Sequence, residues 1–427
     1  MQLVEKHVIK KTDPRFAALD RAAFASKNLY NAALYEIRQH FIFTGKYVNY
    51  NAIDKIMQKH EAYRALPTKV PQQVLKLLDK NWTSFFAALR AYKDDPSRFL
   101  GRPKLPGYKD KQAGRNVLVY TIQALSQPAL RQGIIKPSQL GIEVRTRQRN
   151  VDQVRIVPTR SGCYVVEVVY TQVEEQKALD PSLVAAVDIG VNNLVALTSN
   201  KPGFVPRLVN GRSIKSVNQR YNKQAANMRR KMSHNHHTSQ TLERVSAKRT
   251  RRIDHCMHTV SRCIIDVLVI EQIATLVIGK NPGWKQESTM SKKNNQHFVQ
   301  LPHARFIDML TYKATLVGIA VMVQEESYTS KASFLDLDTI PVYGKTGEEK
   351  PVFSGKRIAR GLYKAKSGRA FNADVNGSYN ILRKALPDAF SNGIKDVNKT
   401  LVVLPASLVV HPVRIVIPSK LKMSRKR

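Results

Sequence analysis

Two aspartates far apart in the chain are the residues best suited to chemistry. Asp188 ends an apolar run in AAVDIGVNNLVALT (185–198), where Gly190 and two asparagines turn the chain into a second β-branched run. This pattern predicts strand, tight turn and strand, although such turns are common and often only structural. Asp374 stands in FNADVNGSYNI (371–381), in the first turn of a predicted helix. Carboxylates from a strand and a helix could together hold divalent cations, which activate water to hydrolyse a phosphodiester.

Three segments resemble the RuvC-type nuclease core of TnpB (OrfB) proteins, the transposon-encoded, RNA-guided relatives of the type V CRISPR effectors. They are DIGVNNL, EESYTSKASFLD and NADVNGSYNI, within a resemblance that runs from about Pro71 to Leu386. The resemblance implies an RNase H-like (RuvC) α/β core with a mixed sheet. It also implies that Asp188 and Asp374 are catalytic and bind Mg²⁺, that guide RNA is a cofactor, and that double-stranded and displaced single-stranded target DNA are partners.

The usual second catalytic carboxylate is missing from its place. The resemblance puts a glutamate near the end of the buried strand Thr275–Lys280, where this chain has Gly279. The next strand, Ile319–Glu326, ends in Glu325 and Glu326, and in an RNase H-like sheet these two strands are neighbours. One of the two glutamates could therefore supply the missing ligand, with Glu326 as a candidate Mg²⁺ ligand. Because side chains alternate along a strand, only one can face the site, and the sequence leaves open which one.

Two other glutamates and one alternative remain for this position. Glu271 precedes the strand at a helix end, and we interpret it as structural. Glu287 lies in the loop WKQES and could swing inward, but without rigid support. The alternative to a relocated glutamate is a nuclease that has lost its activity.

A zinc site is not expected. Typical members of the family carry a four-cysteine zinc ribbon before the last aspartate, whereas residues 331–371 contain no cysteine and Ala332 stands where the first would be. The range is expected to be a basic loop that touches DNA. His234, His236 and His237 in SHNHHTS could bind a metal, but a polar loop tip is the favoured interpretation.

The charge indicates a polyanionic partner. The net charge is +38, from 70 Lys and Arg against 32 Asp and Glu, which exceeds what solubility needs and is best balanced by phosphates. A Gly/Pro loop (98–116) and the helical range 212–252, with twelve Lys and Arg against one Glu, carry much of it. A solvated linker and a charged helix face are the alternatives. The predicted nucleic-acid contacts are Arg102, Lys104, Tyr108, Lys109, Arg229, Arg230, Lys231, Lys248, Arg249, Arg251, Arg252, Lys356 and Arg357.

The chain is expected to divide into an N-terminal domain and an interrupted core. The first strand and the hairpin at 151–173 predict a small β-barrel that carries a helical insertion, whose apolar stripe at 71–92 is interpreted as core rather than as a base-stacking surface. The predicted parts are 1–178 (barrel, with the helical insertion at about 17–93), 179–331 (core, with a basic helical insertion at 210–265), 332–371 (remnant of the target-nucleic-acid-binding loop), 372–390 (last core helix) and 391–427 (basic tail).

These features predict an RNA-guided DNA endonuclease of an insertion-sequence element. It would cleave target DNA beside a short flanking motif by Mg²⁺-dependent hydrolysis. The alternative is a nuclease-inactive, RNA-guided DNA-binding protein that represses transcription. A strand-transfer transposase fits less well, because no Tyr nucleophile accompanies a paired His motif. The chain shows no signal peptide and no run of about 18 apolar residues. We therefore expect a soluble cytoplasmic protein that associates with the nucleoid when it binds DNA and has no membrane partner. The sequence leaves its oligomeric state open.

Overall fold

The chain divides into two units, Met1–Gln172 and Val173–Arg427, and apolar strands build a sheet in each of them. The computed structural model describes residues 1–233, 237–281, 292–342, 351–390 and 408–415. The observed boundary lies six residues before the predicted one. Within the described ranges, no helix has the length and apolar character needed to cross a membrane.

The sheet of the first unit is antiparallel, with the order β1-β6-β5-β2. Its strands are β1 (Gln2–Ile9), β2 (Leu118–Thr121), β5 (Val151–Pro158) and β6 (Tyr164–Thr171). The predicted hairpin is β5–β6, which turns through Gly162 at φ 74°. The edge strands β1 and β2 do not pair with each other in the described ranges, so the predicted barrel is an open sheet. Helices rather than further strands cover its apolar face, and Val154 and Val166 share one core with Leu19 and Leu75.

Those helices are the predicted insertion. They are α1 (Phe16–Thr44), α2 (Tyr50–Met57), α3 (Glu61–Arg64) and α4 (Val70–Asp94). The apolar stripe of α4 is core, as predicted: Trp82 is fully buried, and its ring lies 5.4 Å from that of Phe41. The remaining short elements of this unit are α5 (Gln127–Arg131), β3 (Ile134–Ile135), β4 (Val144–Arg145), and the 3-10 helices η1 (Pro96–Arg98) and η2 (Ile122–Ala124).

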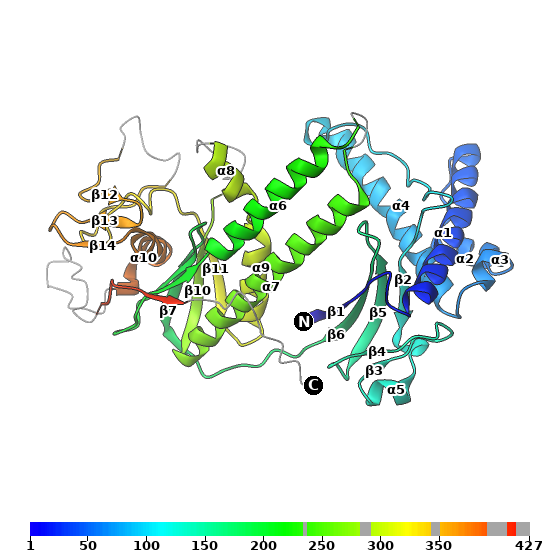
Figure 1. Ribbon diagram of the computed structural model, residues 1–427, viewed down its shortest axis with the longest axis horizontal. Coiled ribbons are helices and arrows are strands. Elements are labelled where there is room, and N and C mark those ends of the chain that lie inside the picture. The colour runs from blue at the N-terminus through cyan, green and yellow to red at the C-terminus, as the bar shows by residue number, and fades with distance from the viewer. Residues whose placement is uncertain (234–236, 282–291, 343–350, 391–407, 416–427) are drawn as a thin grey trace. The chain divides into compact units, whose positions relative to one another are not determined.

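The second unit is built on a mixed sheet with the order β11-β10-β7-β8-β9-β15 (Figure 1). Strands β7 to β9 are antiparallel, β10 and β11 run parallel to β7, and β15 runs parallel to β9. The strand that ends at Gly279 and the strand that precedes Glu326 are therefore neighbours, as predicted. The strands are β7 (Asp180–Asp188), β8 (Asn193–Ser199), β9 (Arg207–Asn210), β10 (Ile273–Gly279), β11 (Ala320–Gln324) and β15 (Val413–Ile415).

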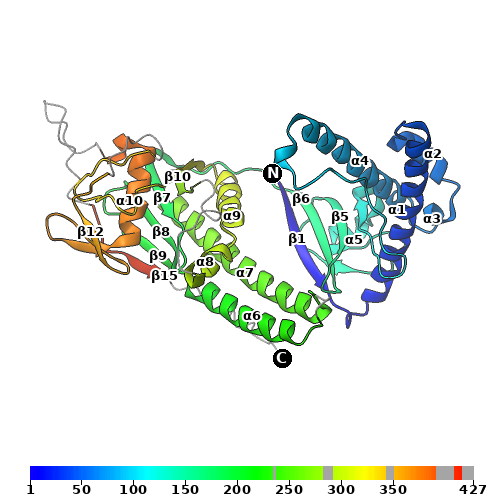
Figure 2. The ribbon, with the colours of Figure 1, turned by 90° about the horizontal axis from the view of Figure 1, so that it is seen from above.

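Helices cover both faces of this sheet. Figure 2 shows α9 and α10 on opposite sides of β7 and β10. One core joins α7 and α9 to Val187 and Ile278, and the other joins α10 to Ala186 and Val277. The helices are α6 (Arg212–Arg230), α7 (Gln240–Ile270), α8 (Lys292–Val299), α9 (His303–Thr315), α10 (Ala373–Ala385) and the 3-10 helix η3 (Pro387–Phe390).

Two predictions about irregular segments are wrong. The basic loop within 332–371 contains a three-stranded antiparallel sheet of β12 (Lys356–Ala359), β13 (Leu362–Lys364) and β14 (Ala370–Asn372). The buried rings of Tyr363 and Phe371 pack against each other beneath it. The described part of the predicted tail, residues 408–415, packs on the core, because β15 pairs with β9 and Val410 is buried in the same core cluster as α10.

Candidate metal centre

The parallel strands β7, β10 and β11 end at the same edge of the sheet. Ile278 pairs with Val187, so Gly279 lies level with Asp188, and Gly279 itself pairs with Gln324 at the end of β11. Side chains alternate between the two faces of a strand. Asp188 therefore points to the same face as Ala186, and position 279 to the same face as Val277, which is the face that α10 covers.

The space that a side chain at position 279 would fill is occupied by Glu326. A Cβ atom on Gly279 would lie 2.4 Å from Glu326 Oε2 and 2.6 Å from Ile381 Cδ1, both too close for real contacts. The backbone N–H of Glu326 donates to Asn281 Oδ1 at 2.9 Å. The glycine and the glutamate are therefore coupled: the carboxylate absent from β10 is replaced in space by one from just beyond β11.

The neighbouring Glu325 is engaged elsewhere. Lys384 Nζ donates to Glu325 Oε2 at 2.5 Å, and also to the carbonyl oxygens of Ser327 and Pro341. The Lys384 side chain is only 6% exposed, so it needs these acceptors. Glu325 thus forms an ion pair with α10, whereas Glu326 lies against Gly279, which is level with Asp188. That Glu326 is the catalytic glutamate stays a prediction.

Asp188 lies directly against α10. A Cβ atom on Gly377 would come within 2.8 Å of Asp188 Oδ2, so a glycine is needed for the helix to approach this carboxylate. The Ser378 hydroxyl donates to the Ala186 carbonyl oxygen at 3.0 Å and fixes the helix on the strand. Asp188 is partly buried as a result.

Asp374 is presented by the first turn of α10. The Asn372 side chain caps the helix and accepts from the backbone N–H groups of Asp374 and Val375. Asn193 Nδ2 donates to Asp374 Oδ2 at 2.7 Å, and an Arg357 guanidinium nitrogen lies 3.8 Å from Asp374 Oδ1. The two oxygens thus face an amide and a cation in the present arrangement.

The three carboxylates are electrostatically linked through Asp188. Burial, followed by repulsion from Asp374, raises the pKa of Asp188 to about 7, against an opposing effect of Arg357. Burial, followed by repulsion from Asp188 and Glu325, raises the pKa of Glu326 to about 8, although Lys384 opposes it. Acidic groups at close range in a partly buried site favour protonation unless a cation joins them.

The oxygen donors suit Mg²⁺ better than a softer metal. Mg²⁺ commonly takes only one or two protein carboxylates and completes its shell with water and substrate phosphate. Among the described residues, however, no three His, Cys, Asp or Glu side chains are already grouped closely enough to hold an ion. Asp188 interacts electrostatically with both Glu326 and Asp374.

Other candidates for metal chemistry are placed elsewhere or not described. Glu271 accepts from Lys201 at 2.9 Å and from Arg207 at 3.1 Å, which agrees with its predicted structural role. Glu287, His234 and His236 lie outside the described residues.

The predicted nucleic-acid contacts of the second unit are exposed, with one exception. Arg229, Arg230, Lys231, Lys248, Arg251, Arg252, Lys356 and Arg357 are all exposed. Arg249 is instead held within the fold, where it donates to Asn218 Oδ1 at 2.7 Å and stacks over the Tyr221 ring. Burial also lowers the pKa of Arg249. The charge pattern of a helix cannot separate such a cation from its exposed neighbours.

The Gly/Pro loop of the first unit is only partly free. Arg102 and Lys104 are exposed, whereas Asn31 on α1 exchanges two hydrogen bonds with the backbone of Lys109. Lys109 Nζ lies over the Tyr30 ring, and burial lowers the pKa of Lys109. Tyr108 is 48% exposed and stacks under Arg38. Lys109 is therefore an anchor for the loop more than a free phosphate contact.

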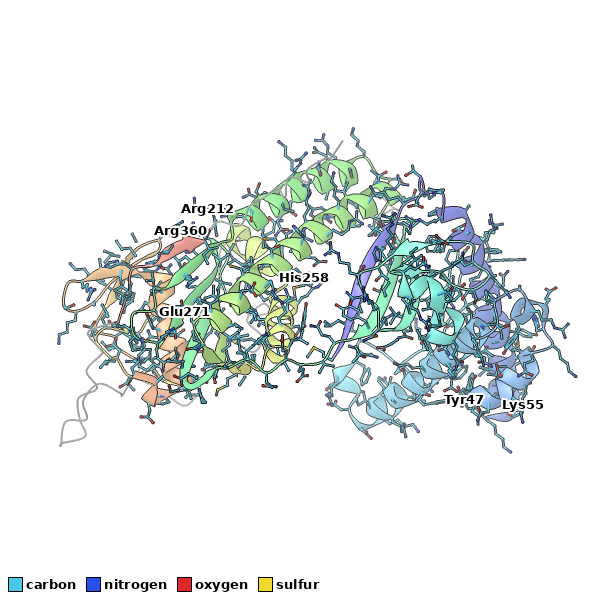
Figure 3. All side chains as sticks on the ribbon, turned by 90° about the horizontal axis from the view of Figure 1, so that it is seen from below. Tyr47, Lys55, Arg212, His258, Glu271 and Arg360 are labelled. Carbon is cyan, nitrogen blue, oxygen red and sulfur yellow. The ribbon has the colours of Figure 1, made fainter. Side chains whose placement is uncertain are left out.

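A basic cleft that the sequence did not reveal opens beside Asp374. Its volume is about 1170 Å³, and its cations come from α6, from the β12–β13 hairpin and from β15. They are Arg212, Lys215, Arg357, Arg360 and Arg414. Figure 3 shows Arg212 and Arg360 next to each other at this place. The Asn192 side-chain oxygen accepts from Arg360 Nε at 3.0 Å, in the amide orientation that suits its neighbours.

Known proteins resemble the chain in several segments. Residues 165–285 match the OrfB_IS605 family of probable transposases, and residues 303–381 match the Cas12f1-like TNB domain. A TnpB-like protein, ORF457 of Acidianus two-tailed virus, is 24% identical over 409 residues, covering 86% of this chain and 83% of the relative.

Two solved structures also align with most of the chain. One is a Cas12f1–sgRNA–target DNA complex, with a TM-score of 0.48 and 14% identity over 86% of this chain and 81% of that one. The other is the mini-RNA-guided endonuclease CRISPR-Cas_phi3, with a TM-score of 0.44 and 9% identity over 90% and 92%.

Proposed function

Because the chain is a TnpB-family protein related to the type V CRISPR effectors, we propose that it is an RNA-guided DNA endonuclease of an insertion-sequence element. Guide pairing would read the target sequence, while the protein would read a short flanking motif and the shape of the backbone. Guide RNA, duplex target DNA and the displaced single strand would be its partners. The charge of +38 supports binding to such polyanions.

The observation that carries this proposal is Glu326 in the space above Gly279. Glu326 is repelled by Asp188, so its position has an electrostatic cost. It also requires a glycine at position 279, because a side chain there would clash with the carboxylate. A nuclease that had lost its activity would not need this costly arrangement. Asp188 and Glu326 would hold Mg²⁺ together with Asp374. Mg²⁺ bound there would supply activation of water and stabilisation of the leaving oxygen.

The protein's own groups would prepare this reaction. Asn281 holds the backbone at Glu326, and Asn193 orients one Asp374 oxygen through its amide. Gly377 lets α10 approach Asp188 closely enough for the last aspartate to stand beside it. These contacts would keep the carboxylates in place although they repel one another.

A nuclease-inactive DNA-binding repressor is the second candidate. It is favoured by one feature: the Asp374 oxygens already face Asn193 and Arg357, and no group of three ligands is assembled among the described residues. In that case guided binding would occur without cleavage.

Guided cleavage in the presence and absence of Mg²⁺ separates the two candidates. The protein is expressed with the RNA encoded beside its gene and offered matched duplex DNA with a randomised flanking motif. We expect cleavage that EDTA stops and Mg²⁺ restores. Asp188→Asn, Asp374→Asn and Glu326→Gln should each abolish cutting but keep guided binding, while the matched control Glu271→Gln should still cut. Binding by the wild type with no cutting under any condition would select the repressor.

A further inference from the structure

The basic cleft carries far more positive than negative charge. Five cations line it, and Asp374 is its one carboxylate among the described residues. Cations that face one another across a cleft repel unless an anion lies between them. The cleft therefore favours an anionic ligand.

The segment 408–415 contributes one residue, Arg414, to this cleft. Arg414 pairs in register with Leu208 of β9, and the Val413 backbone N–H donates to the Pro206 carbonyl oxygen at 2.8 Å (Figure 2, where β15 lies beside β9). Tyr379 of α10 donates its hydroxyl to the Val409 carbonyl oxygen at 2.7 Å, and Val410 is 1% exposed. The segment is thus anchored to the sheet and to α10, which fixes the place of Arg414.

The hairpin β12–β13 supplies the facing wall. Its arginines Arg357 and Arg360 are exposed toward the cleft, near Asp374 and Asn192 respectively. The described lining contains five cations, the carboxylate of Asp374, side-chain amides, small residues and the aliphatic Val191 and Ile358, but no aromatic ring. Without a ring on which bases could stack, such a surface binds the sugar–phosphate backbone and not the bases.

We propose that the C-terminal segment is a working part of the substrate cleft: Arg414, together with Arg357 and Arg360, binds the phosphates of a single nucleic-acid strand and leads it to Asp374. This inference rests on the proposed function only for what happens at Asp374. Binding of the strand itself needs no metal, so it can be tested separately from cleavage.

A photoreactive residue inside the cleft provides a local test. Ile358 is 46% exposed, lines the cleft and carries no charge. The full-length protein, with Ile358 replaced by p-benzoylphenylalanine, is irradiated in EDTA with fluorescein-labelled single-stranded DNA, or with RNA of the same sequence. We expect a covalent adduct with at least one of the two strands. The matched control carries the same group in place of Val323, which is 55% exposed on β11, at the opposite edge of the sheet, and should give none.

Charge substitutions then identify the partners of the strand. Arg360→Gln with Arg414→Gln should lower the Ile358 adduct at least fivefold, and the corresponding Lys substitutions should retain most of it. Lys55→Gln with Arg64→Gln, two exposed cations outside the cleft and outside the predicted nucleic-acid contacts, should leave it unchanged. The inference would be overturned by any of three results. These are no adduct at position 358, an equal amount of adduct at position 323, or an adduct yield that does not change when the cleft arginines are substituted. Adduct formation without guided cleavage would support strand binding in the cleft and contradict the proposed nuclease activity. Guided cleavage without an adduct would support the nuclease activity and contradict strand binding in the cleft.

Discussion

Gly279→Ala is the smallest change that tests the coupling between the glycine and Glu326. The new methyl would lie 2.4 Å from Glu326 Oε2 and 2.6 Å from Ile381 Cδ1, whereas ordinary contact begins at 3.4 Å. If the backbone holds, the carboxylate oxygen must move by 3.4 − 2.4, or about 1.0 Å. A displacement of about 1 Å at a reacting centre can lower the rate about 100-fold.

The same substitution has a cost in stability. Crowding a packed site with one methyl costs about 1–3 kcal/mol. The lost freedom of the unfolded glycine would by itself stabilise the protein by about 0.4–1 kcal/mol. The net expectation is a loss of up to about 2.6 kcal/mol in the free energy of unfolding. Gly101→Ala is the control, because its Cβ would meet nothing within 4 Å.

Thermal unfolding and guided cleavage both test the placement of Glu326 beside Gly279. The Tm of Gly279→Ala should lie below that of the wild type. Adding Ile381→Val, which removes the clashing Cδ1, should recover part of the lost Tm. In guided cleavage, Gly279→Glu and Glu326→Gly should each be inactive, while the double variant, which moves the carboxylate back to β10, should regain measurable cutting. A Gly279→Ala protein as stable and as active as the wild type would refute the placement of Glu326.

Three further predictions concern charge. Burial raises the folded-state pKa values of Asp188 and Glu326 from 3.8 and 4.5 to about 7 and about 8. The two carboxyl groups therefore stabilise the metal-free fold at acid pH and lose that contribution progressively as the pH rises from about 4 to about 8. Scanning fluorimetry should show that Mg²⁺ raises Tm more above pH 8 than below pH 6, and a Tm gain independent of pH would contradict this. Lys384→Met should lower the free energy of unfolding by about 3 kcal/mol, because it leaves the partly buried carboxylate of Glu325 without its partner cation. Urea unfolding measures this loss, and an unchanged midpoint would argue against the ion pair. Arg249→Ala should lower Tm, because Arg249 is held within the fold by Asn218. Arg251→Ala, at an exposed position, should leave Tm unchanged and reduce the salt dependence of RNA binding. Identical behaviour of the two variants would contradict the assignment of Arg249 to the fold and of Arg251 to phosphate contacts.

The parts of the site that the sequence predicts are those with strong local patterns. Asp188 ends an apolar strand before a turn, and Asp374 follows an Asn that caps its helix, so both elements are found where they were expected. The choice between Glu325 and Glu326 could not be made in this way. It depends on Lys384, 59 residues further along the chain, and on the space above Gly279, and neither contact leaves a local pattern.

The wrong predictions concern short strands with exposed, charged residues. All four residues of β12 are exposed, so its sequence has no apolar alternation to mark it. Strand β15 has three residues and pairs with β9, about two hundred positions earlier in the chain. Such a strand is specified by the edge it joins, and this explains why Arg414 and the cleft were not predicted.

The position of the metal tests the central claim most directly. Crystals of the complex with guide RNA and target DNA, grown with Mn²⁺ in place of Mg²⁺, would locate the ions by anomalous scattering. We expect density shared by the carboxylates of Asp188, Glu326 and Asp374, and its loss in Glu326→Gln. Bound Mn²⁺ that Glu326 does not contact, or a site that stays empty while guided DNA is fully bound, would contradict the account.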